Sequence, residues 1–329
     1  MIHPLITVLY SFLLSNTTDS LQAFHLNGIA QGTSYHITYY APTNQIEKKE
    51  IDRLFNQIDS SLSLYKPYSR INQFNHQIRG VKMDQHMYSV VDKAIEISAV
   101  TNKAFDITCK PMIDLWNNQS SKNLPPSDQQ IKNVVTAIGS EHLIIKDDSL
   151  LKDNPLVQID CDGIAQGYSV DQIAKIFKQN HVQDFIVELG GEVYASGHPP
   201  GKAAWNVAIQ SQATKSFSND STAIKLSDFA VTTSGRMSKF KKIGSSYYSH
   251  IFNPNTGKPL QSKIISVTVI AKDAMTADAL DNALMVMGID KSMKWLQHYP
   301  ETGVLIQYLD DQGIVQKRTN EFFRKYSYN

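Results

Sequence analysis

Residues 157–187 have the sequence VQIDCDGIAQGYSVDQIAKIFKQNHVQDFIV, in which a strand pattern, a glycine-containing loop, a helix pattern and a second strand pattern follow one another. The triplets VQI at 157–159 and FIV at 185–187 are rich in β-branched and aromatic residues, which favours strands. Residues 169–178 separate the two triplets and predict a helix. The loop at 160–168 therefore joins a predicted strand to a predicted helix.

The rest of the chain continues this mixture of strands and helices without a regular order. Apolar spacing and β-branched content predict helices at 45–64, 87–100 and 275–287, and strands at 35–40, 143–145, 205–209 and 266–270. Polar residues and prolines predict surface loops at 118–128 and 211–222. Because no βαβ repeat at Rossmann spacing occurs, we expect an α+β fold rather than a doubly wound sheet.

Composition excludes several classes of protein. The chain has 329 residues with 32 Lys and Arg against 31 Asp and Glu, a net charge of +1 that argues against nucleic-acid binding. Hydrophobic residues make up 42% and charged residues 19%, as in globular proteins. Two cysteines, Cys109 and Cys161, are too few for a disulfide scaffold or a multi-cysteine zinc site, and whether they pair is left open.

The N-terminal residues resemble an export signal. Residues 5–14, LITVLYSFLL, form an apolar run too short to cross a bilayer, and Ala23 is a candidate cleavage position. We therefore expect residues 1–23 to be a signal or leader segment and residues 24–329 to be one domain of an exported protein. A buried N-terminal strand is the alternative. No cysteine near this run offers a lipid attachment point.

Glycines gather in clusters beside the predicted strands. The clusters lie at 160–168, 188–192, 232–235 and 253–259, the last preceded by His250. Glycine lets the backbone approach a ligand closely, although each cluster alone is typical of an ordinary turn. The chain has neither the GxxxxGK[ST] pattern of a P-loop nor the GxGxxG pattern of a Rossmann fold.

The predicted helix at 275–287 carries the most specific pattern. Asp278, Asp281 and Asn282 stand at positions i, i+3 and i+4, which share one face of a helix. Two carboxylates and an amide oxygen suit a hard cation such as Mg²⁺. The alternative is that acids in an early helical turn only complement the helix dipole.

Together these patterns resemble the FAD:protein FMN transferase (ApbE) family from about residue 28 to residue 288. The matching segments, in chain order, are AQGTSY at 30–35, SLYKPYS at 63–69, FDITCKP at 105–111, GIAQGY at 163–168, LGGE at 189–192, TSG at 233–235, HIFNPNTGKP at 250–259 and ADALDN at 277–282. The chain departs from the family pattern at Gln31, Gln166 and Asn282, which replace Met, Lys and Thr.

The resemblance implies a Mg²⁺-dependent exported enzyme that cleaves the pyrophosphate of FAD. It would attach the FMN half, through its phosphate, to a threonine hydroxyl of a partner protein and release AMP. The implied acceptors are flavin-bearing subunits of membrane redox complexes of the sodium-pumping quinone reductase (Nqr) or Rnf type. The implied location is the periplasm or the outer face of the inner membrane, with peripheral membrane association left open. The implied fold is one large domain of mostly antiparallel sheets flanked by helices, with a flavin cleft.

The resemblance also assigns residues. Metal-binding positions are Gly163, Asp278, Asp281 and Asn282, and catalytic positions are Asp278 and His250. His250 would serve as the base for the threonine hydroxyl or would contact phosphate. The positions that match the family's FAD contacts are Gln31, Tyr65, Ala104, Phe105, Asp106, Asp160, Gln166 and Ile251. Two alternatives stay open at this point: an FAD pyrophosphatase that yields FMN and AMP, and a flavin-binding protein without catalytic activity.

Overall fold

A computed structural model describes residues 20–209, 222–235, 240–243, 246–249 and 251–328. The predicted leader up to residue 19, most of the predicted loop at 211–222 and the predicted catalytic His250 lie outside the described residues. Ala23, the candidate cleavage position, lies in the first strand. In the described residues, no helix combines the length and the apolar character needed to cross a membrane.

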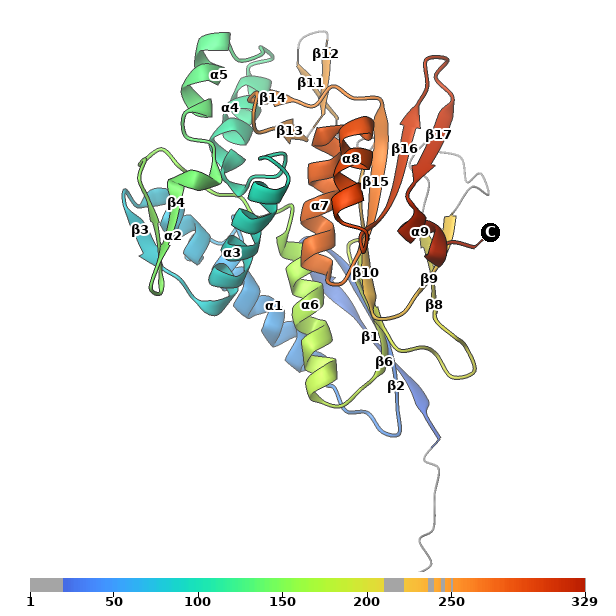
Figure 1. Ribbon diagram of the computed structural model, residues 1–329. Helices are drawn as coiled ribbons and strands as arrows, with labels where there is room; N and C mark the ends of the chain where they lie inside the picture. The colour runs from blue at the N-terminus through green and yellow to red at the C-terminus, as the bar shows by residue number, and fades with distance from the viewer. Residues whose placement is uncertain (1–19, 210–221, 236–239, 244–245, 250, 329) are drawn as a thin grey trace, which may run out of the picture.

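An eight-stranded antiparallel sheet forms the centre of the fold (Figure 1). Its spatial order is β1-β2-β6-β7-β10-β15-β16-β17, so β1 and β17 are the two edges. The strands are β1 (Gln22–Ala30), β2 (Thr33–Ala41), β6 (Asp184–Leu189), β7 (Glu192–Ser196), β10 (Phe229–Gly235), β15 (Ile264–Ala271), β16 (Gly303–Leu309) and β17 (Val315–Thr319).

Helices cover one face of this sheet and enclose the main hydrophobic core. They are α1 (Lys48–Leu62), α3 (Gln85–Val100), α6 (Ala165–Gln179) and α7 (Ala274–Met287), followed by α8 (Ile289–Trp295) and η3 (Leu296–His298). Their apolar faces meet alternate sheet residues such as Ile37, Val187 and Val269. The helix α7 lies against both α6 and the central strands β10 and β15.

The opposite face of the sheet has a smaller core. The hairpin of β8 (Trp205–Ile209) and β9 (Thr222–Leu226) and the short helix α9 (Glu321–Tyr326) cover it. Val231 and Leu305 point into this second core, whereas their strand neighbours Ala230 and Val304 point into the main core. This alternation follows from the two-residue period of a strand.

The remaining elements form a lobe beside the helices in Figure 1. They are α2 (Arg70–His76), β3 (Gly80–Lys82), η1 (Ile107–Cys109), α4 (Lys110–Ser121), α5 (Asp128–Val135), η2 (Ser140–His142), β4 (Leu143–Lys146), β5 (Ser149–Lys152), β11 (Phe240–Ile243), β12 (Ser246–Ser249), β13 (Phe252–Asn253) and β14 (Lys258–Pro259). The mixture of antiparallel sheets and packed helices confirms the predicted α+β fold.

Two local predictions are wrong, and the loop predicted at 160–168 is shorter because α6 begins at Ala165. Residues 157–159 do not join a sheet, although Val157 and Ile159 are fully buried. The side chain of Asn75 accepts from Ile159 N (2.7 Å) and donates to Ile159 O (2.9 Å), so it replaces the hydrogen bonds that a neighbouring strand would supply. The predicted loop at 118–128 is shorter, because α4 continues to Ser121.

Candidate active site

The acidic turn of α7 points into the protein. Asp278 and Asp281 are 5% and 1% exposed. Asp278 Oδ2 accepts from the backbone N of Gly167 on α6 (3.0 Å), and Asp281 Oδ2 accepts from Thr232 Oγ1 on β10 (2.8 Å). The two carboxylates therefore lie where α7 meets α6 on one side and the central sheet on the other.

Burial dominates the electrostatics of this pair. It raises the pKa of both Asp278 and Asp281, and the charges of Glu192 and, for Asp278, of Asp281 raise them further. No Lys or Arg of the described residues forms an ion pair with either acid. A bound cation would stabilise two buried acids that have no basic partner in the part of the chain that the structure describes.

The donor set fits Mg²⁺ but does not enclose it. Within the described part of the chain, no three His, Cys, Asp or Glu side chains are grouped as a complete metal site. Mg²⁺ in proteins commonly takes one or two carboxylates and fills its remaining positions with water and substrate phosphate. Asp278 and Asp281 therefore meet the protein's share of such a site.

Asn282 faces the acids with its nitrogen. Its Nδ2 donates to the carbonyl oxygen of Asp278 (3.0 Å) and to Asp281 Oδ1 (3.1 Å), and its Oδ1 accepts from Ser234 Oγ (3.1 Å). The side chain in this orientation steadies the carboxylate of Asp281. The prediction that Asn282 supplies a metal-binding oxygen stays a prediction. It requires Asn282 Oδ1 to contact the ion while it also accepts a hydrogen bond from Ser234 Oγ.

Glycines let α6 approach α7 closely. A Cβ atom on Gly167 would lie 2.3 Å from the carbonyl oxygen of Ala274 and 2.8 Å from Asp278 Cβ. A Cβ atom on Gly163 would lie 3.3 Å from Asn282 Nδ2. Gly163, the metal position that the family resemblance implies, is therefore next to the acidic turn.

Asp171 fixes the start of α7. Its two carboxylate oxygens accept from the backbone N of Ala274 and of Met275, both at 2.8 Å. Burial, with the charge of Asp273, raises the pKa of Asp171 to about 7. The first turn of α7 is thus tied to the middle of α6, and this orients the acids one turn further along.

A pocket of about 760 Å³ opens beside this junction. Its walls come from the β1–β2 turn, the end of α1 with the loop that follows, and the start of α6. The lining residues are Ile29, Ala30, Gln31, Gly32, Ile58, Asp59, Leu62, Ser63, Tyr65, Lys66, Asp162, Ala165 and Gln166. The structure therefore brings three of the predicted FAD contacts, Gln31, Tyr65 and Gln166, to one cavity.

The side chains of Gln31 and Tyr65 differ in their surroundings. Gln31 occupies the β1–β2 turn with a φ of 51°, and its amide exchanges hydrogen bonds with Ser169 Oγ (2.9 and 3.1 Å). This contact ties the turn to α6. Tyr65 is 85% exposed at the pocket wall, so its ring is open to stacking with a flat ligand.

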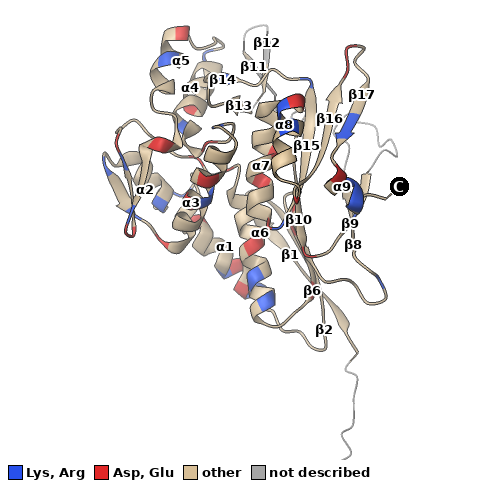
Figure 2. Ribbon diagram, viewed as in Figure 1, with Lys and Arg blue, Asp and Glu red and all other residues tan. Residues whose placement is uncertain are grey.

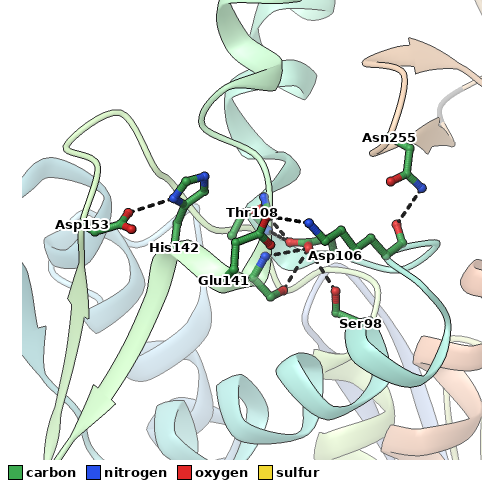
Figure 3. A network of polar contacts seen from close by, with 10 residues as sticks. Ser98, Asp106, Thr108, Glu141, His142, Asp153 and Asn255 are labelled. Carbon is green, nitrogen blue, oxygen red and sulfur yellow. Dashed lines mark hydrogen bonds and ion pairs between the residues drawn. The ribbon is translucent and has the colours of Figure 1, made fainter.

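Asp106 is a structural centre of its loop (Figure 3). Its carboxylate accepts five hydrogen bonds, from the backbone N and Oγ1 of Thr108, from Ser98 Oγ and from the backbone N and Oγ of Ser140. All three partners are buried, and they come from α3, η1 and η2. The side chain is fully engaged, so a contact to FAD from this residue would come from its backbone.

The other predicted flavin contacts lie outside the wall of this pocket. Ala104, Phe105 and Ile251 are buried, and Phe105 Cε2 would lie 3.4 Å from a Cβ atom on Gly163. Burial and the charge of Asp162 raise the pKa of Asp160 to about 7.

The two cysteines, whose pairing the sequence left open, do not form a disulfide bond. Cys109 and Cys161 are both free thiols.

The predicted site residues do not include Glu192, although it acts on both acids of α7. Its position after the paired glycines of LGGE was the available signal. Asp59 and Lys66 also line the pocket and are absent from the prediction. No local pattern distinguishes them from the other surface charges of a helix end and a loop.

Comparisons with known proteins agree with this geometry. The family model described as "ApbE family" matches residues 31–306. The chain is 30% identical to the FAD:protein FMN transferase of Vibrio cholerae over 94% of this chain and 95% of that protein. It is 27% identical to the Haemophilus influenzae protein of the same name, over 98% and 97%.

The fold of the chain is also similar to solved structures of flavin transferases. The flavin transferase ApbE from Vibrio cholerae superposes with a TM-score of 0.82 at 29% identity, over 93% of this chain and 99% of that one. The apo form of the Pseudomonas stutzeri flavinyl transferase ApbE superposes with a TM-score of 0.82 at 26% identity, over 93% and 97%.

Proposed function

The chain belongs to the ApbE family and is a flavin transferase, and we propose that it transfers the FMN moiety of FAD to a threonine hydroxyl of a partner protein. In the proposed reaction, the threonine oxygen attacks the phosphorus of the FMN half. The bond from that phosphorus to the bridging oxygen breaks, and AMP leaves with the bridging oxygen. The hydroxyl proton passes to a base.

One observation carries the proposal: the buried acids Asp278 and Asp281 lie against the glycine-containing start of α6, whose residues also line the pocket. Together with Gly163 and Asn282, these acids would hold Mg²⁺. Bound there, the ion would neutralise negative charge on the pyrophosphate oxygens. The pocket would bind the dinucleotide, with the Tyr65 ring stacked on a flat ring system and Gln166 lining the wall next to Gly167 in sequence.

The test of the function is mass spectrometry of an acceptor protein incubated with the purified chain, FAD and Mg²⁺. A suitable acceptor is the soluble domain of a flavin-bearing subunit of the Nqr type. Transfer adds the mass of an FMN phosphoester to one threonine and releases an equal amount of AMP. Free FMN and AMP without labelled protein would identify the alternative, an FAD pyrophosphatase. FAD binding without any product would identify a flavin-binding protein.

His250→Ala tests the proposed base. A threonine hydroxyl is a weak nucleophile, and loss of a general base lowers such rates by about 10²- to 10⁴-fold. We expect kcat for transfer to fall in this range while the affinity for FAD, measured by quenching of flavin fluorescence, stays near that of the wild type. A large loss of FAD affinity would instead place His250 against the phosphates.

Metal binding should depend on pH in a defined direction. Because the pKa values of Asp278 and Asp281 are raised above the ordinary 3.8, the metal-free fold is most stable when both are protonated. Their contribution is lost as the pH rises through the raised values. Mg²⁺ binds the ionised form, so it should raise the melting temperature more at pH 8 than at pH 5.

Thermal unfolding with EDTA or with Mg²⁺ at the two pH values measures this effect. Saturation at about 100 times Kd would add about 2.7 kcal/mol. Asp278→Asn should reduce the Mg²⁺ shift at pH 8, whereas Asp290→Asn, an exposed acid beyond α7, should not. An equal Mg²⁺ shift at both pH values would contradict the assignment of the metal to these acids.

We further propose that the mature protein acts outside the cytoplasm after removal of residues 1–23. The apolar run at 5–14 supports this, and the proposed acceptors are membrane complexes. Mass spectrometry of the mature N-terminus and fractionation of cells test it. A mature chain that still begins at Met1 in the cytosolic fraction would contradict export.

A further inference from the structure

The two edges of the central sheet differ in how they are protected. The edge strand β17 has five residues and carries Lys317 and Arg318. The other edge strand, β1, has nine residues, of which residues 24–30 would remain in the proposed mature chain. It pairs with β2 without a register shift and contains neither a proline nor a charged residue. Figure 2 shows β1 and β2 without charged residues and β17 with basic ones. Short length, proline and lysine are the usual means of preventing strand addition, and β1 has none of them.

The register of β1 shows which backbone groups face outward. The turn at Gln31 and Gly32 has φ of 51° and 78°, the geometry of a two-residue hairpin whose closing pair, Ala30 and Thr33, is hydrogen-bonded. Alternation along the ladder then directs the N–H and C=O groups of His25, Asn27 and Ile29 away from β2. In the described residues, no further backbone hydrogen bond reaches these groups.

The outward edge of β1 ends at the pocket of about 760 Å³ described above. Ile29 and Ala30, at the end of β1, line the pocket, and the turn after them contributes Gln31 and Gly32. The side chain of Ile29 is 86% exposed, so the fold itself does not use its apolar surface. A polypeptide paired with β1 would run along about 20 Å of strand and arrive directly at the cavity.

We propose that the acceptor segment carrying the flavin-receiving hydroxyl binds β1 as an added strand, with Ile29 packing against one of its apolar side chains. The inference rests on the proposed function, which requires a protein hydroxyl to reach this pocket. Main-chain hydrogen bonds would supply most of the affinity, and the residues nearest Ile29 would set the register. The partner is therefore an extended, proline-free segment of a second protein.

Asn27→Pro tests the proposal, with Asn27→Ala as its control. Proline removes the outward N–H and its ring blocks an approaching strand, but it breaks no backbone hydrogen bond to β2. Both variants lose the contact of Asn27 Oδ1 with His36 Nδ1 (3.0 Å), so only the proline variant tests strand addition. The probe is the soluble domain of an Nqr-type flavin subunit. We expect the KM for this acceptor to rise about tenfold in Asn27→Pro, with FAD affinity and kcat unchanged, and Asn27→Ala to match the wild type.

His25→Pro with His25→Ala repeats the comparison one outward position further from the pocket, in case proline at residue 27 disturbs the fold. Wild-type KM in both proline variants would overturn the proposal. A wild-type dimer that Asn27→Pro dissociates without changing transfer would also overturn it, since the edge would then bind a second copy of this chain. Failure of the proposed function is distinct, because the wild type itself would then label no acceptor.

Discussion

Asp278→Asn should lower the rate of flavin transfer by at least about 100-fold without unfolding the protein. The substitution removes one of two carboxylates proposed to hold Mg²⁺, but the amide keeps an oxygen that can accept from the backbone N of Gly167. Burial already disfavours the charge of this side chain, so the neutral amide should leave the metal-free protein as stable as before, or more stable at pH 8.

Two measurements separate function from folding in this variant. The rate of acceptor labelling with FAD and Mg²⁺ should collapse, while the melting temperature in EDTA should hold or rise. Asp290→Asn is the matched control, because Asp290 is exposed and should change neither quantity. Transfer at the wild-type rate in Asp278→Asn would remove the acidic turn from the mechanism.

Gly167→Ala should destabilise the protein by about 1–3 kcal/mol, although alanine is the better helix former by about 1 kcal/mol. The added methyl group would lie 2.3 Å from the carbonyl oxygen of Ala274 and 2.8 Å from Asp278 Cβ. The first of these atoms is backbone and cannot rotate away, so α6 and α7 must separate. The hydrogen bond from Gly167 N to Asp278 would then lengthen.

This separation should also cost activity, because it moves Gly163 and Gln166 away from the acids. We expect a lower melting temperature and slower transfer together, measured by thermal unfolding and acceptor labelling. Lys175→Ala, an exposed change on the same helix, controls for helix propensity alone. A Gly167→Ala protein as stable and as active as the wild type would show that the α6–α7 contact is looser than these distances imply.

The long helices and some of the strands are predictable from short stretches of sequence. The predicted strand at 205–209 matches β8, and the predicted helix at 275–287 differs from α7 by one residue. The spacing of apolar residues and the residues typical of turns can be read within a window of about fifteen residues. Helices and strands with a clear pattern can therefore be recognised without knowing the fold. The prediction fails at 157–159, where the hydrogen-bond partner is a side chain more than eighty residues away.

The acidic turn itself was predictable, because Asp278, Asp281 and Asn282 share a helix face through spacing alone. Their burial and raised pKa values were not, because the elements that bury the acids and the charge of Glu192 on β7, which raises both pKa values, come from other parts of the chain. The same reason explains Asp106. Its motif suggested a flavin contact, which stays a prediction, but not the two hydrogen bonds that its carboxylate accepts from Ser140, 34 residues away.

Residue patterns along the chain were enough to predict α1, α3, α6 and α7, the strands β2, β4, β6, β8 and β15, the family resemblance and the donor atoms available for chemistry. Which donors meet, which carboxylates are buried, where the pocket opens and that β1 is an edge strand of the described sheet follow only from the tertiary structure. Residue type and local period are properties of neighbouring positions along the chain. Desolvation, edge exposure and cavity shape arise from contacts between segments that the sequence separates, and these exist only once the sheet and helices have packed.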